Sequence, residues 1–338
     1  MSIVKSKEIH LVSRPNGEPL AENFLVREVE IKEVKENEIL VKNLWMSVDP
    51  YMRGRMIDRK SYVPPFELGK TLEGGAIGIV IKSKCPDFKE GDFVNSNFGW
   101  REYFNAEGKY LKKVNPDIGP LQAYLGTLGM PGMTAYVGLL RIGNLKEGDK
   151  VMISAAAGAV GTVASQIAVA KGCEVFGTAG SDEKCSFLEK DLGLTKAINY
   201  KTCGHLIKSF HSACPNGVDV YFENVGGSHL EAALSIMRPN GRIALCGMIE
   251  QYNDTAPRPG PNNLMAAIAK SLKIEGFIVS NHSDLSEKFL TDMKSWIDSG
   301  KMQWKETIDE GIESAPGAFL KLFKGQNFGK MLVKIADK

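Results

Sequence analysis

The chain has 338 residues, of which 43% are hydrophobic and 24% are charged, and its formal net charge is +2. This length predicts about two domains, and the composition is typical of a soluble globular protein with enough apolar residues for a core. The nearly balanced charge, with no long basic block, argues against a dedicated nucleic-acid surface.

The cysteines and the N-terminus both bear on the compartment. The six cysteines are scattered without C-x-x-C spacing, so we expect reduced thiols rather than a disulfide framework. Ile3 and Val4 are followed at once by charged residues, which leaves no apolar core for a signal peptide. These observations predict a cytoplasmic protein.

Residues 1–120 hold short segments in which apolar and polar residues alternate between Gly and Pro residues. Such a pattern predicts an all-β, partly closed sheet domain. The clearest segments are Leu25–Ile31, Glu38–Leu44, Glu73–Ile81 and Asp92–Asn95. Near the other end of the chain, Ser314–Phe323 is predicted to be a helix and Lys330–Ile335 a strand, and this strand can return to the first domain.

The stretch Lys150–Lys171 combines a short apolar strand, a glycine turn and a helix of small residues. The strand is Val151–Ser154 and the turn is Ala155–Gly161, after which apolar residues recur at helical spacing. Phosphate binds backbone N–H groups at the start of such a helix when no side chain blocks it. Gly158 allows that approach and Gly161 lets the helix pack on the strand, so the stretch is a candidate dinucleotide site.

Two other interpretations fit the same stretch. Val151–Ala170 is about long enough to span a bilayer, but it contains several polar and glycine residues and its first half is β-like. An ordinary buried strand and helix that bind nothing is the second alternative. The glycine pattern is weak by itself, and here Ala156 occupies its first position.

From residue 150 onward, strand and helix patterns alternate, which predicts right-handed crossovers and a parallel, doubly wound sheet. The further predicted strands are Glu174–Thr178, Lys196–Tyr200, Val218–Glu223, Arg242–Cys246 and Ile274–Val279. The predicted helices are Asp182–Leu192, Leu206–Ala213 and Leu230–Met237, and Pro239–Gly241 is predicted to be a turn. Ligands of such sheets bind at the carboxyl ends of strands. Ala155, Thr178, Asn224 and Gly247 should meet there, which favours the dinucleotide site.

A set of motifs spread over nearly the whole chain is specific in combination. They are Val48–Gly54, Ala155–Gly161, Gly180–Lys184, Ile198–Lys201, Glu223–Gly227, Cys246–Asn253 and Gln326–Lys330. On these motifs the chain resembles the medium-chain dehydrogenase/reductase superfamily, in its zinc-free branch of prostaglandin, 2-alkenal and bacterial curcumin reductases. The resemblance implies an α/β fold, with a Rossmann doubly wound parallel sheet in residues 126–305. It also implies an N-terminal GroES-like β domain in residues 1–125 with 306–338.

The resemblance also implies a cofactor in the cleft between the domains, a homodimer, and roles for particular residues. The residues that would cradle the pyrophosphate are Gly158, Ala159, Val160 and Gly161, and Lys184 and Tyr200 would hold the 2′-phosphate side. Those that would line the ribose and nicotinamide are Asn224, Cys246, Gly247, Met248, Ile249, Tyr252, Phe277, Ile278, Val279 and Asn327. Glu223 departs from the family pattern, since many relatives carry Asp there, and Glu250 and Gln251 replace the common Ser and Thr.

The residues at the end of the predicted strand Glu174–Thr178 indicate which cofactor binds. An NAD site usually has an acidic residue at the end of that strand, but Thr178–Ser181 is small and uncharged. Lys184, one turn into the helix, suits a phosphate, although a surface lysine is the alternative. Asp182 and Glu183 could be the acidic ligand, but they more naturally cap the helix. We therefore expect NADP(H).

The chemistry is expected to need no metal. Zinc dehydrogenases of this superfamily require Cys and His ligands in the first domain, where His10 is the only histidine and Cys85 stands alone. A reaction that needs no metal is hydride transfer to the β-carbon of an α,β-unsaturated aldehyde or ketone, such as a 15-oxoprostaglandin-like enone. Such a small-molecule substrate is the expected partner, with neither nucleic acid nor membrane involved.

Two tyrosines are the candidates for roles around the substrate. Tyr252 is the candidate donor to the carbonyl oxygen, and the alternative is that it only orients the cofactor. Tyr51 would line the substrate pocket, or be purely structural. Two rival functions stay open: a quinone reductase of the same superfamily, and a non-catalytic NADPH-binding protein similar to lens crystallins.

Overall fold

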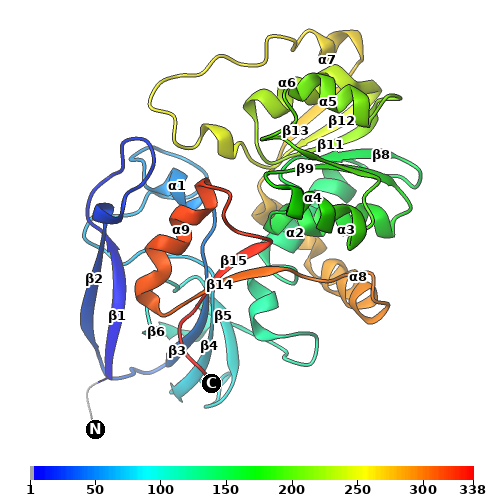
Figure 1. Cartoon of the computed structure of the whole chain (residues 1–338). Helices are drawn as coiled ribbons and strands as arrows, with labels where there is room; N and C mark the ends of the chain where they lie inside the picture. The colour runs from blue at the N-terminus through cyan, green and yellow to red at the C-terminus, as the bar shows by residue number, and fades with distance from the viewer. Residues whose placement is uncertain (1–3) are drawn as a thin grey trace. The chain divides into compact units, whose positions relative to one another are not determined.

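The computed structural model describes residues 4–338. Ile3, which is part of the sequence argument against a signal peptide, lies outside the described residues. The chain divides into two compact units. One consists of residues 1–125, 306–327 and 331–338, and the other of residues 126–305 and 328–330. The C-terminal segment therefore contributes to both units. In Figure 1 the first unit includes the blue and cyan strands and helix α9 near the red end, and the second unit includes the green and yellow segments and the orange helix α8.

The first unit is built on a seven-stranded sheet in the order β14-β15-β3-β4-β5-β7, with β6 also paired to β3, and on a separate β1–β2 pair. The strands of the sheet are β3 (Glu38–Ser47), β4 (Ala76–Ser83), β5 (Phe93–Ser96), β6 (Tyr103–Glu107), β7 (Lys112–Lys113), β14 (Glu306–Glu310) and β15 (Lys330–Lys334). The pair consists of β1 (Val4–Leu11) and β2 (Phe24–Ile31), joined antiparallel. The predicted β domain is confirmed, and the predicted terminal strand returns to it as β15, antiparallel to β3.

Helix α9 (Ala315–Phe323) packs into the core of this first unit. Phe319 of α9 lies edge-on to Trp100, with their ring centroids 6.2 Å apart. Trp100 in turn stacks on Phe24 of β2 at 6.1 Å. Trp100 and Phe319 are fully buried. A segment from the end of the chain thus completes a core that begins at its start. A short helix, α1 (Met52–Arg55), also contributes to this core.

The second unit contains the predicted parallel sheet, with six strands in the order β10-β9-β8-β11-β12-β13. The strands are β8 (Lys150–Ile153), β9 (Glu174–Ala179), β10 (Lys196–Asn199), β11 (Val218–Glu223), β12 (Met237–Leu245) and β13 (Lys273–Gly276). The chain adds strands outward from β8 to β10, then crosses to β11 and adds strands in the other direction. The strand order therefore reverses between β8 and β11, which is where doubly wound sheets bind ligands.

Helices connect the strands of this sheet, mostly as predicted. They are α2 (Met130–Tyr136), α3 (Ala159–Ala170), α4 (Asp182–Lys190), α5 (Leu206–Ala213), α6 (Gly227–Ile236), α7 (Ala266–Ala269) and α8 (Ser286–Asp298). A π-helical stretch, Val137–Ile142, continues α2. No helix within residues 4–338 combines the length and the apolar character needed to cross a membrane.

Two predicted elements differ in detail. The expected turn at Pro239–Gly241 lies inside β12, which begins at Met237 and pairs with β11 on both sides of a register shift. Asn240 takes a left-handed φ of 61° in this irregular stretch. The last strand, β13, is shorter than expected and ends at Gly276. Its neighbour β12 ends at Leu245, opposite Gly276, so nothing continues the pairing.

Candidate functional site

The glycine turn lies between β8 and α3, at the point where the strand order of the sheet reverses. Ala155 has a left-handed φ of 48°, and Gly158, with extended backbone, precedes the first turn of α3. A Cβ added to Gly161 would lie 2.2 Å from the carbonyl oxygen of Ala155, so only glycine lets α3 rest on the turn. No side chain caps the N–H groups at the start of α3. This cradle fits the pyrophosphate of a dinucleotide.

A segment from the end of the chain borders the same turn. The backbone N–H of Gly329 donates to the carbonyl oxygen of Ala157 at 2.9 Å, and Gly329 forms a parallel bridge with Gly158. Gly329 has a φ of 68°, and a Cβ there would lie 1.8 Å from the carbonyl oxygen of Lys305. Asn327, a predicted nicotinamide residue, belongs to the first unit and comes shortly before Gly329.

The end of β9 gathers the residues expected to hold the 2′-phosphate. Ser181 caps α4, accepting the backbone N–H of Lys184 on its hydroxyl at 3.3 Å. Burial, and then the charge of Lys201, lowers the pKa of the Lys184 ammonium group. Tyr200, which follows β10, lies beside Gly180. A Cβ at Gly180 would be 3.0 Å from the Tyr200 hydroxyl. The stretch Thr178–Ser181 at this end of β9 carries no charged side chain.

A buried carboxyl group connects the ends of β8 and β11. Glu223 is fully buried, and its Oε1 accepts hydrogen bonds from the Ser154 hydroxyl and the Val225 N–H, both at 2.7 Å. Asn224 donates its backbone N–H to Ser154 Oγ at 2.7 Å and its side-chain amide to the Ser154 carbonyl oxygen at 2.8 Å. Burial raises the pKa of Glu223. The network fixes Asn224 at the end of its strand.

The loop after β12 is held by the same residues. The N–H groups of Cys246 and Gly247 donate to the carbonyl oxygen of Glu223 at 2.9 and 3.0 Å, and that of Ile249 donates to the carbonyl oxygen of Asn224 at 3.2 Å. Burial raises the pKa of the Cys246 thiol to about 12, so it stays protonated.

Glycines bring two further loop residues close to the strand ends. The hydroxyl of Tyr252 lies 3.2 Å from where a Cβ of Gly247 would be, so the phenol rests against this glycine. The Cβ of Met248 would lie 2.9 Å from a Cβ at Gly226, so its side chain adjoins the segment after β11.

Residues Phe277, Ile278 and Val279 follow β13. The ring of Phe277 adjoins Gly138 of the π-helical stretch, since a Cβ at Gly138 would lie 2.8 Å from it. Ile278 precedes a short 3₁₀ helix that starts at Val279. The predicted cofactor residues of the second unit thus all follow the carboxyl ends of its parallel strands. Sequence reasoning missed Ser154 and the contact of Gly329, and gave Glu223 no role.

The first unit has a cavity of about 590 Å³ that includes Tyr51, the predicted substrate residue, which lies between β3 and β4 in sequence. Burial, and then the charge of Asp49, raises the pKa of Tyr51 well above its ordinary range. The guanidinium of Arg55 lies 4.0 Å from the centre of the Phe66 ring and pairs with Glu73 at 2.8 Å. The remaining cavity residues are Val63, Pro64, Pro65, Glu67, Lys70, Thr71, Gly74 and Asn97.

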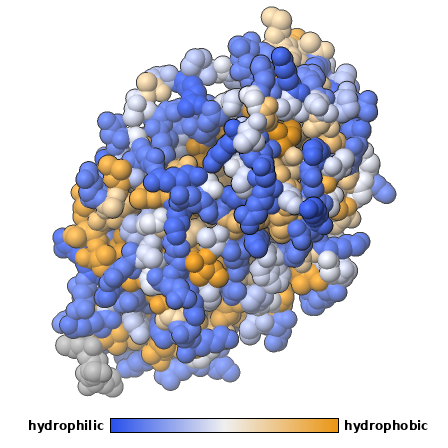
Figure 2. All heavy atoms as spheres, in the orientation of Figure 1, coloured by the Kyte–Doolittle hydropathy of each residue, from blue (hydrophilic) through white to orange (hydrophobic). Residues whose placement is uncertain are grey.

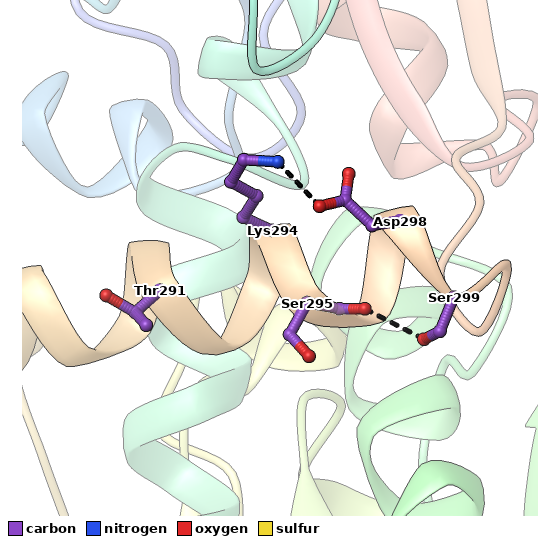
Figure 3. A pocket seen from close by; sticks show the side chains of 5 residues that line it. All are labelled: Thr291, Lys294, Ser295, Asp298 and Ser299. Atoms are coloured by element: carbon purple, nitrogen blue, oxygen red, sulfur yellow. Dashed lines mark hydrogen bonds and ion pairs between the residues drawn. The ribbon is translucent and has the colours of Figure 1, made fainter.

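A second hollow, on α8, is open and holds no predicted site residue (Figure 3). Two interactions within the helix connect residues of this hollow: Lys294 pairs with Asp298 at 2.5 Å, and the Ser299 hydroxyl donates to the Ser295 carbonyl oxygen at 2.8 Å. Within residues 4–338, no group of three or more His, Cys, Asp or Glu residues is arranged to hold a metal ion.

Comparison with known proteins gives matches over nearly the whole chain. Residues 7–114 match the family model "N-terminal domain of oxidoreductase", and residues 159–295 match the model "Zinc-binding dehydrogenase". The putative NADP-dependent oxidoreductase YfmJ of Bacillus subtilis is 46% identical over 98% of each chain. Prostaglandin reductase 1 of Rattus norvegicus is 42% identical over 98% of this chain and 100% of its own.

Among solved structures, CurA from Vibrio vulnificus in complex with NADPH is 38% identical, with a TM-score of 0.93. The match covers 98% of this chain and 100% of CurA. The chain therefore belongs to the medium-chain dehydrogenase/reductase superfamily, within the branch of prostaglandin, 2-alkenal and curcumin reductases. The resemblance drawn from the sequence motifs is thereby confirmed.

Proposed function

We propose that the protein is an NADPH-dependent reductase of the carbon–carbon double bond in α,β-unsaturated aldehydes and ketones. The observation that carries this proposal is the end of β9, where Thr178–Ser181 carries no carboxylate, the Tyr200 hydroxyl lies beside Gly180, and Lys184 belongs to the first turn of α4. An ammonium and a phenol there suit a 2′-phosphate, whereas a ribose hydroxyl would call for an acidic residue. The named relatives of this branch support the same cofactor.

The second unit would bind the cofactor and the first would bind the substrate. The N–H groups at the start of α3 would bind the pyrophosphate. Asn224, held by Ser154, and the loop held by Glu223 would orient the nicotinamide end. When bound, NADPH supplies a hydride for the β-carbon of the substrate. The residues of the chain therefore have to bind the cofactor and the substrate, orient them, and exclude water.

Hydride addition to the β-carbon puts negative charge on the substrate carbonyl oxygen, and a hydrogen-bond donor aimed at that oxygen stabilises the enolate. A proton from solvent then adds to the α-carbon and completes the saturated product. We assign the hydrogen-bond donor to the Tyr252 hydroxyl, which is positioned against Gly247 in the loop after β12. In the first unit, the cavity of Tyr51 would receive the apolar part of the substrate, with Val63 and Phe66 in its wall.

We also propose that the chain forms a homodimer and acts in the cytoplasm. Strand β13 is an edge of its sheet, and apolar residues near it are exposed: Leu264, Met265, Ile268 and Ile274. An open edge beside an apolar patch is suited to pairing with a second copy. Figure 2 shows hydrophobic residues interspersed with hydrophilic ones over the face in view. Light scattering coupled to gel filtration gives the mass, and a monomer at micromolar concentration contradicts the dimer.

The activity is tested by following NADPH consumption with a panel of acceptors: 2-nonenal, an enone of similar length, a saturated aldehyde and a quinone. We expect turnover with the enal and enone, none with the saturated aldehyde, and a saturated product by mass spectrometry. Faster turnover of the quinone favours a quinone reductase. Binding of NADPH with no rate above the blank for any acceptor favours a non-catalytic NADPH-binding protein.

A further inference from the structure

The turn after β10 carries a lysine to which the cofactor assignment gives no role. Lys201 follows Tyr200 directly, and its backbone N–H donates to the side-chain oxygen of Asn199 at 3.1 Å. The side-chain amide of Asn199 donates to Asp182 at 2.7 Å, so the turn after β10 is tied to the first turn of α4. The backbone of Lys201 is therefore fixed beside the helix that carries Lys184.

The side chains of Tyr200 and Lys201 both close over Gly180. A Cβ at Gly180 would lie 3.0 Å from the Tyr200 hydroxyl and 3.3 Å from Cε of Lys201. Both distances are tighter than ordinary van der Waals contact, so the absence of a side chain at Gly180 leaves room for the two groups. The phenol and the end of the lysine stem thus lie over the same face of the strand end.

Two ammonium groups act on each other here. The charge of Lys201 lowers the pKa of Lys184, second only to burial, while Glu183 has a smaller and opposite effect. Lys201 forms no ion pair with a carboxylate of the described part of the chain. Like charges held close repel each other. An anion with two negative charges bound between them would remove that repulsion.

We propose that Lys201 is a second cationic ligand of the 2′-phosphate of NADPH and a determinant of the preference for NADPH over NADH. The inference rests on the proposed function, because it assumes that this cofactor binds at the end of β9. A phosphate monoester carries a charge of about −1.5 to −2 near neutral pH. One ammonium leaves part of that charge uncompensated, whereas two ammonium groups and a phenol donor match the charge and the oxygens.

The test uses calorimetric binding of adenosine 2′,5′-bisphosphate and of 5′-AMP to the full chain, so it does not depend on turnover. Lys201→Ala should lower the affinity for the bisphosphate about three- to tenfold, as expected for a solvent-exposed charge-assisted contact. It should change the affinity for 5′-AMP less than about twofold. Lys201→Arg should retain most of the affinity. Lys208→Ala, on the exposed face of α5, is the matched control and should change the affinity for neither ligand.

Salt gives a second measurement. The difference in bisphosphate affinity between the natural chain and Lys201→Ala should shrink between 0.05 and 0.5 M NaCl, because salt screens exposed charges. An equal loss for both ligands, or no loss, overturns the role of Lys201. If Lys201→Ala gives either of these two results while the natural chain still binds the bisphosphate more tightly than 5′-AMP, the proposed cofactor stands and only the role of Lys201 is overturned. If the natural chain binds both ligands equally, the NADPH assignment itself is overturned.

Discussion

At the scale of single residues, we expect Lys184 to be a main determinant of the preference for NADPH over NADH. Burial, and then the charge of Lys201, lowers the pKa of its ammonium group. Lys184→Ala should raise the KM for NADPH about 10- to 100-fold, the size expected for a lost hydrogen bond to a charged group. The KM for NADH should change little. Steady-state kinetics with both cofactors measures this, and an equal rise for both contradicts the assignment.

Tyr252 is the residue on which the proposed chemistry depends. Its hydroxyl lies against Gly247, and Tyr252→Phe removes the hydroxyl but keeps the ring. We expect kcat for 2-nonenal to fall about 100-fold, which is typical of losing one donor to a developing oxyanion. A tyrosine that only orients the cofactor would instead raise the KM for NADPH at constant kcat. An unchanged rate would remove Tyr252 from the mechanism.

His229 gives a prediction for the dependence of stability on pH. It is buried against the rings of Tyr200 and Phe210, and burial lowers its pKa to about 4. Between pH 6.5 and 4 the unfolded chain binds the proton and the folded chain does not. Folding stability therefore falls over this window as the pH is lowered, by up to about 3 kcal/mol.

His229→Phe should remove this part of the pH dependence. Urea unfolding at pH 7 and pH 5 measures it, as the difference between the variant and the natural chain at each pH. His211→Gln, at an exposed site on α5, is the control and should leave the dependence as it is. If the natural chain and His229→Phe lose the same stability between the two pH values, the imidazole does not titrate as stated.

How far single residues could be predicted depended on whether their signal was local. The role of Lys184 stays a prediction, but Lys184 was proposed because the stretch next to the strand end is short and uncharged. Ser154 and Glu223 were not, because they are far apart in sequence and their hydrogen bond exists only once β8 and β11 are neighbours. For Gly329 the signal was one glycine in a motif, which does not indicate the segment that it contacts.

At the scale of elements, the contact between β8 and α3 rests on Gly161. Gly161→Ala would place a Cβ 2.2 Å from a backbone oxygen, so the helix must move away from the turn. We expect a loss of about 1–3 kcal/mol in stability, typical of overpacking, and a weaker affinity for NADPH. Gly317→Ala in α9 is the control, because its Cβ meets nothing within 4 Å and alanine favours a helix. Thermal unfolding should therefore shift in opposite directions for the two variants.

Most elements were predictable because apolar runs of strand length alternate with helical patterns. The exception at Pro239–Gly241 shows how tertiary structure overrides a local turn signal. Strand β11 pairs with Met237 before the irregularity and with Arg242 after it, so pairing on both sides draws the turn into the strand. The length of β13 was also not predictable, since it depends on where its neighbour ends.

At the scale of the whole molecule, the C-terminal segment should stabilise both units. Deleting residues 328–338 removes β15 from between β14 and β3, and also the hydrogen bond from Gly329 to the turn before α3. We expect the thermal transition to lose its cooperativity or to fall well below that of the natural chain. A chain lacking only residues 337–338 keeps β15 and should unfold close to the natural temperature. An unchanged transition in the longer deletion contradicts the role assigned to this segment.

The same segment constrains the order of events during synthesis. Strand β3 leaves the ribosome early, but its neighbour β15 is translated after all the other described strands, roughly 15 to 60 s later at ordinary elongation rates. During that interval residues 45–47 of β3 lack their partner strand β15, and the apolar core of the first unit lacks helix α9. We expect the nascent chain to depend on chaperones that cover unpaired strand edges. A circular permutant that starts at Glu306 should be less dependent on them.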